Sequence, residues 1–358
     1  MPTKEELKML QALPLEIKVA KTQQRIREFV ERFGEDGVYV SFSGGKDSTV
    51  LLHIVRSMYP DIEAVFVDTG LEYPEIRQFV KTFDNVTILR PKMKFNEVIR
   101  KHGYPIISKE VSNTIHGARI SIKKGKYSLR LCKLGVEPHE VCVVHDGKRD
   151  YRATLENSKF RQFKWVPLLN TDFMMSSYCC DINKKAPLHE YEKRTGKKPI
   201  IGTMTSESLN REIAWIKHGC NVFQCNKAQC NPLSFWTGQD ILHYIKKEEL
   251  LIASVYGDIV YTDDDGYEYN NSLLDGELRT TGCDRTGCVY CGFGCHLDKE
   301  PSRFQRLKET HPRQYEYCIG GGEYDADGMW KPNKEGLGMG HVFDELNKIY
   351  GEGFIKYK

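Results

Sequence analysis

Apolar residues near the start of the chain recur three or four positions apart, which is the spacing of a helix that buries one face. This pattern covers residues 15–33 and ends at Gly34, a residue type that commonly follows a helix. Short apolar runs, which predict buried strands, follow at residues 38–40, 64–67 and 86–89. Helical patterns separate these runs, at residues 49–58 and 74–83. Strands that alternate with helices predict βαβ units, so we expect an α/β fold with a parallel sheet flanked by helices.

Two polar loops follow the first two predicted strands. They are residues 43–48 (SGGKDS) and residues 68–70 (DTG). Ligands of open α/β sheets bind beyond the carboxyl ends of the strands, so these loops are the expected ligand site. Sheet-like and helical patterns return at residues 199–203 and 239–247, which predicts that the same sheet continues in the second half of the chain.

The composition excludes several classes of protein. The hydrophobic share of 40% and the charged share of 28% are typical of a globular protein. No apolar run reaches about 18 residues, which argues against a membrane partner or span. The N-terminal stretch is charged and lacks the apolar core of a secretory signal, so we expect a cytoplasmic protein. A net charge of +3 predicts no obligatory polyanion partner.

Cysteine is the outlier in this composition, with twelve residues in 358. That share is too low for a disulfide scaffold, and without an export signal it indicates metal or redox chemistry. Nine cysteines fall into three groups: Cys179 and Cys180; Cys220, Cys225 and Cys230; and Cys283, Cys288, Cys291 and Cys295. The remaining three, which we expect to be small buried side chains, are Cys132, Cys142 and Cys318.

The last group has a C-x4-C-x2-C-x3-C spacing with interspersed glycines, which lets several thiolates converge on one inorganic centre. Its first three positions have the spacing of plant-type ferredoxins, whereas C-x2-C also occurs in tetrahedral zinc sites. The spacing leaves iron–sulfur and zinc open, with a metal-free cluster as a third interpretation. The C-x4-C-x4-C spacing of the middle group matches no common site type, so a structural role is favoured there over a second metal site.

Residues 118–165 carry twelve Lys or Arg residues against five Asp or Glu, with aromatic residues between them. Such a segment can hold a nucleic acid through its phosphates and by stacking, and a solvated surface insertion explains it equally well. We therefore expect three regions. They are a nucleotide-binding core (1–117 and 166–250), a basic insertion (118–165) and a cysteine-rich C-terminal region (251–358).

Residues 43–48 have the chemistry of an anion site. Gly44 and Gly45 let the backbone bend, so that its N–H groups can meet phosphate oxygens at the positive end of the following helix. Lys46 supplies a mobile cation, and Asp47 supplies a carboxylate for a Mg²⁺ ion that bridges the phosphates. The pattern differs from the G-x4-G-K-[ST] phosphate loop.

This loop resembles the signature of the PP-loop ATP pyrophosphatase superfamily. Further motifs resemble the iron–sulfur type of the phosphoadenosine phosphosulfate (PAPS) reductase family, taken widely to include ATP sulfurylase small subunits and DNA phosphorothioation sulfurtransferases. The motifs are SGGKDS (43–48), DTGLEYPE (68–75), CCDINKKAPL (179–188), GTMTSESLNR (202–211) and PLSFWTGQDILHY (232–244). They occur in the family's order, and the resemblance runs from about residue 37 to residue 300.

The resemblance implies an adenine nucleotide α-hydrolase-like (Rossmann-like) fold that binds ATP with Mg²⁺. It implies that Asp68 and Thr69 lie near the adenosine and that the phosphates contact Ser43, Gly44, Gly45, Lys46, Asp47 and Ser48. It also favours a [4Fe–4S] cluster over zinc. The implied ligands are Cys179, Cys180, Cys288 and Cys291, or alternatively Cys180, Cys283, Cys288 and Cys291, with Cys295 as a further alternate.

Three departures from the family pattern bear on the reaction. Sulfonate reductases use a cysteine in a Glu-Cys-Gly-x-His-like tail, whereas this chain ends GEGFIKYK and its last cysteine is Cys318. The phosphate loop is intact, as in members that split ATP. Met204 stands where the family commonly has Arg, which weakens the expected contact to an anionic group.

We therefore expect an ATP-dependent sulfurtransferase-like enzyme that forms AMP, releases pyrophosphate and adenylates an acceptor, for which a nucleic acid is a candidate. A sulfur-donor protein is a candidate partner, and Cys179 and Cys295 are candidate sulfur carriers where they are not ligands. The expected catalytic residues are Lys46, Asp47, Glu207 and Arg211, with a surface ion pair as the alternative role of the last two. The alternative functions are a (phospho)adenylyl-sulfate reductase and a nucleic-acid-binding module with a structural cluster.

Overall fold

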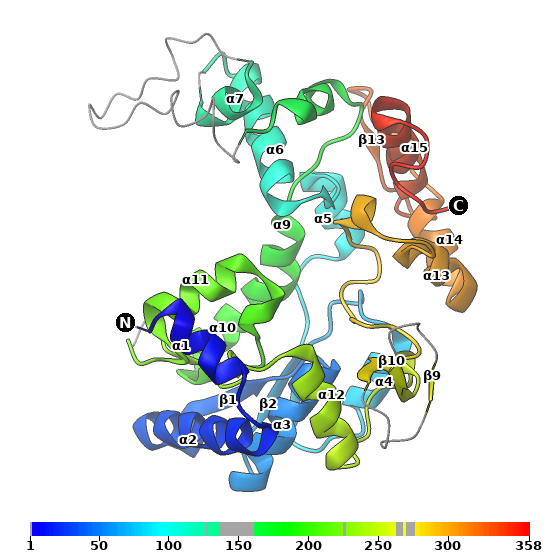
Figure 1. The fold of residues 1–358 in the computed structure, drawn as a ribbon. Coiled ribbons are helices and arrows are strands. Elements are labelled where there is room, and N and C mark those ends of the chain that lie inside the picture. The colour runs from blue at the N-terminus through cyan, green and yellow to red at the C-terminus, as the bar shows by residue number, and fades with distance from the viewer. Residues whose placement is uncertain (1, 127, 137–160, 225–226, 263–267, 270–275) are drawn as a thin grey trace. The chain divides into compact units, whose positions relative to one another are not determined.

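The computed structural model describes residues 2–126, 128–136, 161–224, 227–262, 268–269 and 276–358 (Figure 1). The chain divides into two compact units. Unit 1 comprises Met1–Pro91 and Ala186–Cys288, and unit 2 comprises Lys92–Lys185 and Val289–Lys358. The second division between them therefore falls inside the cysteine-rich region, directly after Cys288.

Unit 1 is built on a six-stranded sheet with the strand order β3-β2-β1-β5-β7-β6. The strands are β1 (Val38–Ser41), β2 (Ala64–Val67), β3 (Val86–Leu89), β5 (Lys198–Ile201), β6 (Asn221–Val222) and β7 (Gln229–Cys230). Neighbouring strands run parallel except for β6, which pairs antiparallel with β7. In the register of the central strand, Val40 lies opposite Ala64 on one side and Ile200 on the other. The predicted parallel sheet is confirmed.

Helices cover both faces of this sheet because side chains alternate along its central strand. Val38 and Val40 of β1 join the large core that α2 and α3 supply, whereas Tyr39 packs on the other face with Val65 and Tyr191. The helices of unit 1 are α1 (Lys4–Gln11), α2 (Leu15–Phe33), α3 (Lys46–Met58), α4 (Pro74–Val80), α10 (Ala186–Thr195), α11 (Leu209–His218) and α12 (Gly238–Lys247). This flanked parallel sheet is the predicted α/β fold.

The predicted helices and strands match the structure closely, with one shortened helix. The apolar pattern at residues 15–33 is α2, and the three predicted strands are β1, β2 and β3. Helix α4 ends at Val80 rather than at residue 83. The amide N–H groups of Lys81 and Thr82 donate to carbonyls three residues earlier, so the chain tightens into a turn there.

The rest of unit 1 consists of short elements beside the sheet. Among its described residues, 3₁₀ helices occur at η1 (Glu35–Gly37), η5 (Thr205–Glu207) and η6 (Ser254–Tyr256), and a small antiparallel sheet has the order β10-β8-β9. Its strands are β8 (Ile259–Thr262), β9 (Glu268–Tyr269) and β10 (Glu277–Thr280). Gly282 approaches η6 closely: its N–H donates to the Tyr256 carbonyl at 2.8 Å, and a Cβ there would lie 2.4 Å from the Val255 carbonyl oxygen.

Unit 2 is mainly helical. Its α-helices are α5 (Phe95–His102), α6 (Lys109–Lys123), α7 (Leu129–Leu134), α9 (Tyr178–Cys180), α13 (Arg303–Thr310), α14 (Pro312–Ile319) and α15 (Met339–Tyr350). Other turns are η3 (Phe163–Asn170), the π-helix η4 (Asp181–Lys185) and η7 (Cys295–Leu297). Two-stranded sheets pair β4 (Ile106–Ile107) with β11 (Gly292–Phe293) and β12 (Glu323–Tyr324) with β13 (Trp330–Lys331).

The core of unit 2 joins segments that are far apart in the sequence. The rings of Phe304 and Phe343 lie 4.9 Å apart, and both side chains are fully buried. The Tyr104 hydroxyl donates to the Leu337 carbonyl at 2.9 Å, which ties the segment before β4 to the segment before α15. The two segments that make up unit 2 are therefore joined by hydrogen bonding.

Candidate functional site

The loop of residues 43–48 joins β1 to α3 at the carboxyl end of β1, as predicted. Gly44 has a φ of +71°, and a Cβ there would lie 2.6 Å from Val80 Cγ2 and 2.8 Å from Ile76 Cγ2. Both the backbone conformation and the close approach of α4 therefore require glycine at this position. Gly45 is the N-cap of α3, which places the next amide groups at the positive end of that helix.

Serine hydroxyls hold the backbone of this loop. The Ser43 N–H donates to Ser48 Oγ at 3.2 Å, and the Gly45 N–H donates to Ser43 Oγ at 3.4 Å. Ser48 Oγ in turn donates to the Gly45 carbonyl at 2.9 Å. The loop is thus fixed by its own side chains, with its amide groups gathered at the start of α3.

A tyrosine that the sequence did not predict contacts the loop. The Lys46 N–H donates to the Tyr256 hydroxyl at 3.1 Å, and this hydroxyl lies 2.6 Å from Thr286 Oγ1. The ammonium group of Lys46 lies 5.8 Å from the centre of the Tyr256 ring. Burial raises the pKa of Tyr256 to about 12, so the phenol is neutral near pH 7. No local pattern indicated either residue, since both lie more than 200 positions from the loop.

Four of the predicted site residues form one charged group beside the loop. The Lys46 ammonium lies 3.2 Å from Asp47 Oδ1, a buried oxygen that accepts no hydrogen bond from the described residues. Arg211 pairs with Glu207, and Arg285 pairs with the same carboxylate. Burial lowers the pKa of Arg211, the nearby Arg285 adds to this effect, and Asp47 opposes it. The structure therefore brings the predicted catalytic residues together and adds Arg285 to them.

The second predicted loop lies at the carboxyl end of the adjacent strand β2 and is held by a carboxylate. The Thr69 N–H and Oγ1 donate to the two oxygens of Glu72, at 3.1 Å and 2.7 Å. Asp68 pairs with Arg77 at 2.9 Å and lies 3.8 Å from Arg90 Nε. Glu72 is part of the DTGLEYPE motif, but only the structure shows that it accepts two hydrogen bonds from Thr69.

The cysteines that were predicted to hold a cluster are shared between the two units. Cys283 and Cys288 belong to unit 1, and Cys179, Cys180, Cys291 and Cys295 belong to unit 2. All six are outside disulfides. Among the residues that the structure describes, no three His, Cys, Asp or Glu side chains are grouped so that they could hold a metal ion. The [4Fe–4S] cluster accordingly stays a prediction.

The thiols of unit 2 differ in their acidity. The hydrogen bond from Cys179 lowers the pKa of Cys180 to about 6, against the effect of burial, and Lys109 and Lys184 lower it further. Burial raises the pKa of Cys291 and raises that of Cys295 to about 12. The thiolate is the form that attacks electrophiles and binds metals, so the lowered pKa favours Cys180 over Cys291 and Cys295 as a reactive thiol.

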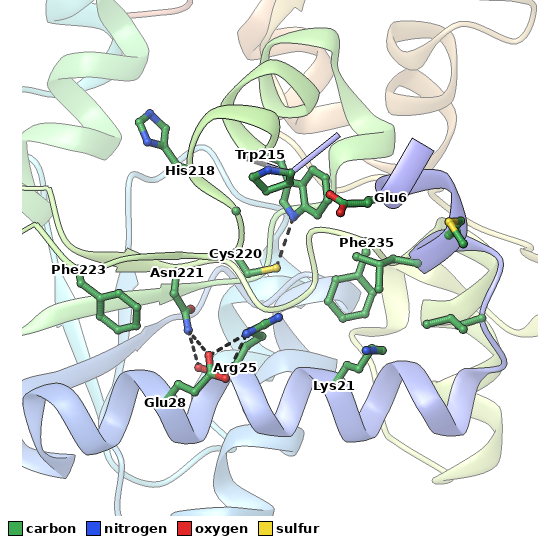
Figure 2. Close-up of a pocket in the computed structure, with 15 residues that line it drawn as sticks. Glu6, Lys21, Arg25, Glu28, Trp215, His218, Cys220, Asn221, Phe223 and Phe235 are labelled. Atoms are coloured by element: carbon green, nitrogen blue, oxygen red, sulfur yellow. Dashed lines mark hydrogen bonds and ion pairs between the residues drawn. The ribbon is translucent and has the colours of Figure 1, made fainter. Parts of the chain in front are cut away.

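One member of the middle cysteine group, Cys220, lines a separate cavity of unit 1, shown in Figure 2. This cavity of about 630 Å³ is lined by α1, α2 and the segment from Trp215 to Phe223. Cys220 Sγ accepts a hydrogen bond from the Trp215 ring N–H at 3.4 Å, and burial raises the pKa of Cys220 and Cys230. Two buried thiols of raised pKa favour the structural role, while Cys225 lies outside the described residues.

The isolated cysteines only partly follow expectation. Cys318 is fully buried, and its Sγ lies 3.6 Å from Met339 Sδ, as expected of a core side chain. Cys132 is also buried, but it is disulfide-bonded, which corrects the prediction that it is merely a small apolar residue. Cys142 lies outside the described residues.

Several basic residues of the segment 118–165 are engaged within unit 2. Arg119 donates to the backbone carbonyls of Leu169, Phe173 and Thr171, so it fixes the end of η3 rather than facing a ligand. The guanidinium of Arg161 lies 4.3 Å from the Phe163 ring, and the Lys164 ammonium lies 4.4 Å from the Trp165 ring. Residues 137–160 of this segment lie outside the described part of the chain.

The described residues include no helix that is both long and apolar enough to cross a membrane.

The chain is similar to several curated proteins. It is 38% identical over 283 residues to an uncharacterized protein of Methanocaldococcus jannaschii, and 22% identical over 284 residues to another from the same organism. Each match covers 78% of this chain but only 40% and 46% of those proteins, so the chain spans less than half of their length. A phosphoadenosine 5'-phosphosulfate reductase of Xylella fastidiosa is 33% identical over 82 residues, which is 23% of this chain and 34% of that protein.

Two solved structures are also similar. A PAPS reductase from Candida auris in a phosphate complex has 14% identity and a TM-score of 0.36, over 71% of this chain and 91% of that one. A Candida glabrata FMN adenylyltransferase in complex with ATP has 11% identity and a TM-score of 0.35, over 75% of this chain and 70% of that one. TM-scores this low support no conclusion about the site.

The family model described as the phosphoadenosine phosphosulfate reductase domain matches residues 37–114 and 141–292. The matched residues make up more than half of the chain. They include both polar loops, the Glu207–Arg211 pair and the residues Tyr256, Arg285 and Thr286 that contact them. The chain therefore belongs to the phosphoadenosine phosphosulfate reductase domain family.

Proposed function

We propose that this chain is an ATP-dependent enzyme that adenylates an acceptor, forms AMP and releases pyrophosphate in preparation for sulfur transfer. An oxygen of the acceptor attacks the α-phosphorus, the bond from the α-phosphorus to the bridging oxygen breaks, and its electron pair leaves with pyrophosphate. A sulfur nucleophile then displaces AMP from the activated carbon. The observation that carries the proposal is the intact loop of residues 43–48, with Lys46, Asp47, Glu207 and Arg211 gathered beside it.

The charges at the loop suit the departure of pyrophosphate. The amide groups at the start of α3 and the Lys46 ammonium would stabilise negative charge on the leaving group. Arg211 adds a second cation, and its partner Glu207 keeps it oriented. Fixed charges of this kind supply most of the rate enhancement in phosphoryl chemistry.

Asp47 is the residue we expect to hold Mg²⁺. Its Oδ1 is buried and accepts no hydrogen bond within the described structure, so this carboxylate oxygen is available for a hard cation. A bound Mg²⁺ would neutralise phosphate charge. Lys46, which lies against the same oxygen, would then turn toward the phosphates.

The sulfur-transfer part of the proposal rests on the cysteines. The lowered pKa of Cys180 suits either a cluster ligand or a sulfur acceptor, whereas the raised pKa of Cys295 makes it a poor carrier. A [4Fe–4S] cluster would draw on Cys180, Cys283, Cys288 and Cys291, and we assign no reaction step to it. An anaerobic absorption spectrum, together with measurements of bound iron and sulfide, tests for the cluster. A colourless protein that contains zinc would exclude the iron–sulfur interpretation.

The acceptor and the donor also belong to the proposal. A nucleic acid is the proposed acceptor because of the charge of residues 118–165, and a separate protein is the proposed sulfur donor. The chain spans less than half of the two Methanocaldococcus jannaschii proteins, so the acceptor and the donor of the complete reaction are both proposals.

Exchange of labelled pyrophosphate into ATP tests the proposed activation step. The purified chain is incubated with ATP, Mg²⁺ and pooled RNA or DNA, and Lys46→Ala serves as the matched inactive variant. Exchange that requires the intact loop supports the proposal. No exchange and no AMP with any nucleic acid would exclude adenylation as the activity.

A (phospho)adenylyl-sulfate reductase is the second candidate, since relatives bearing that name share the family. One observation weighs against it: the last cysteine, Cys318, is fully buried and its pKa is strongly raised by burial. Thiol-dependent release of sulfite that Cys318→Ser abolishes would establish the reductase instead.

A further inference from the structure

Residues 283–288, which we call the cysteine segment, contribute two side chains to the site around the loop of residues 43–48, and all of these residues belong to unit 1. Arg285 pairs with Glu207, the carboxylate that also pairs with Arg211. Thr286 Oγ1 lies 2.6 Å from the Tyr256 hydroxyl, and that hydroxyl accepts the Lys46 N–H. A Cβ built on Gly45 would lie 3.2 Å from the Tyr256 hydroxyl and 3.3 Å from Thr286 Oγ1, so both groups press against the loop itself.

Backbone hydrogen bonds hold the start of the cysteine segment, at Gly282 and Cys283, against η6. The Cys283 N–H donates to the Val255 carbonyl at 2.9 Å, one residue before Tyr256. The preceding Gly282 N–H donates to the Tyr256 carbonyl at 2.8 Å, and a Cβ on this residue would lie 2.4 Å from the Val255 carbonyl oxygen, so glycine is required there. A movement of Tyr256 would therefore also move the cysteine segment. The two are connected by the backbone hydrogen bonds of Gly282 and Cys283 and by the contact between the Tyr256 hydroxyl and Thr286.

The charges around Arg285 point to an anion. Two guanidinium groups, Arg211 and Arg285, share the single carboxylate of Glu207. The side chain of Arg285 is 68% exposed, so it can turn toward a ligand, whereas Glu207 is only 14% exposed. Arginine binds phosphate oxygens in pairs through its planar donors, which suits this site to a di- or triphosphate.

The hydroxyl of Tyr256 accepts a hydrogen bond from an amide group at the start of α3. The first amide groups of a helix have no partner within the helix, and a phosphate oxygen is their usual acceptor at such loops. At Lys46 that acceptor is the Tyr256 hydroxyl. A phosphate that binds the Lys46 amide must displace this hydroxyl, which also lies 2.6 Å from Thr286 Oγ1.

We infer that the cysteine segment forms part of the nucleotide site: Arg285 contacts the phosphates, and Tyr256 with Thr286 transmits phosphate binding at Lys46 to the backbone that carries Cys283 and Cys288. This inference rests on the proposed function, since it takes the ligand to be ATP. It names three site residues that sequence motifs do not indicate. It also makes the position of two predicted cluster ligands depend on whether nucleotide is bound.

Hydrogen–deuterium exchange of the full chain as purified tests this coupling, with and without ATP and Mg²⁺. In the wild type, nucleotide should slow exchange of the loop peptides and change exchange of the peptide covering residues 280–288 by at least about twofold in rate. Arg285→Gln should weaken ATP binding at least about tenfold, the loss expected for a charge-assisted hydrogen bond. Thr286→Val should keep the response of the loop and lose that of the segment, and Thr286→Ser should restore it.

Arg27→Gln is the matched control, because Arg27 is an exposed arginine of α2 in the same unit. It should leave ATP affinity and both exchange responses unchanged. Should the wild-type loop respond while the segment does not, and Arg285→Gln bind ATP normally, the inference is wrong and the proposed function stands. A wild-type loop that shows no response to ATP overturns the proposed function together with the inference.

Discussion

The backbone N–H of Lys46 donates a hydrogen bond of 3.1 Å to the hydroxyl of Tyr256, a residue 210 positions further along the chain. This contact connects the phosphate loop to the segment that carries Cys283 and Cys288, because Thr286 lies against the same hydroxyl. The loop of residues 43–48 and the segment with Cys283 and Cys288 are therefore adjacent within unit 1.

Tyr256→Phe removes the hydroxyl and keeps the ring. The Lys46 N–H then loses its acceptor in a buried position, so the free energy of unfolding of the nucleotide-free protein should fall by about 1–3 kcal/mol. ATP should bind several-fold more tightly, since no hydroxyl has to be displaced. Urea denaturation and titration calorimetry measure the two effects, and weaker ATP binding with unchanged stability would contradict the arrangement.

Asp47→Asn replaces the proposed Mg²⁺ ligand by a neutral side chain of the same shape. We expect pyrophosphate exchange to fall by about 100-fold, with half-maximal rate at a higher Mg²⁺ concentration, because a charged contact to the phosphates is lost. Asp36→Asn, at an exposed position of η1, is the control. An unchanged Mg²⁺ dependence in the Asp47 variant would show that the metal binds elsewhere.

Gly44→Ala should abolish ATP binding and destabilise the protein. The new Cβ would lie 2.6 Å from Val80 Cγ2, and the φ of +71° adds strain for any residue with a side chain. Gly196→Ala separates the two effects, since its φ is +75° but a Cβ there meets nothing within 4 Å. Thermal denaturation should show a loss of about 1 kcal/mol for the control and clearly more for Gly44→Ala. If both variants lose the same stability, the close approach of Val80 to Gly44 does not explain the need for glycine there.

Glu63 gives a prediction about pH. Burial raises the pKa of its carboxyl, but hydrogen bonds from Lys197, Thr87 and Tyr191 outweigh burial and bring the pKa below its ordinary value of 4.5. The unfolded chain then binds more protons in this range, so the stabilisation is complete above about pH 4.5 and is lost as the pH falls through the folded-state pKa.

Glu63→Gln should consequently lower the free energy of unfolding by about 1–3 kcal/mol at pH 7, and by less as the pH approaches 4. Urea denaturation of the wild type and the variant at both pH values measures the difference. A difference that stays constant or grows as the pH falls would contradict the assignment of these hydrogen bonds.

The parts of the fold that are contiguous in sequence were predictable. β1, the loop and α3 follow one another directly, so hydrophobic pattern and loop composition suffice to place Lys46 and Asp47 at the carboxyl end of a strand. The pairing of Glu207 with Arg211 is likewise local, because the two residues are only four positions apart, at the end of η5 and in the first turn of α11.

The contacts of Tyr256, Arg285 and Thr286 could not be predicted in this way. Tyr256 stands in a short 3₁₀ turn and the other two in an irregular segment, where no periodicity marks a functional side chain. Their roles depend on tertiary packing, because Tyr256 contacts Lys46 across 210 residues and Arg285 contacts Glu207 across 78 residues. Spacing also gave no indication that the last cysteine group divides between two units after Cys288.

The most direct test of the central claim compares two reactions of the same purified chain: AMP and pyrophosphate formed from ATP with Mg²⁺ and nucleic acid, and sulfite formed from PAPS with a thiol reductant. We predict that AMP and pyrophosphate appear in equal amounts, that Lys46→Ala abolishes both, and that PAPS yields no sulfite. Sulfite release from PAPS without cleavage of ATP would contradict the account and make the chain a reductase.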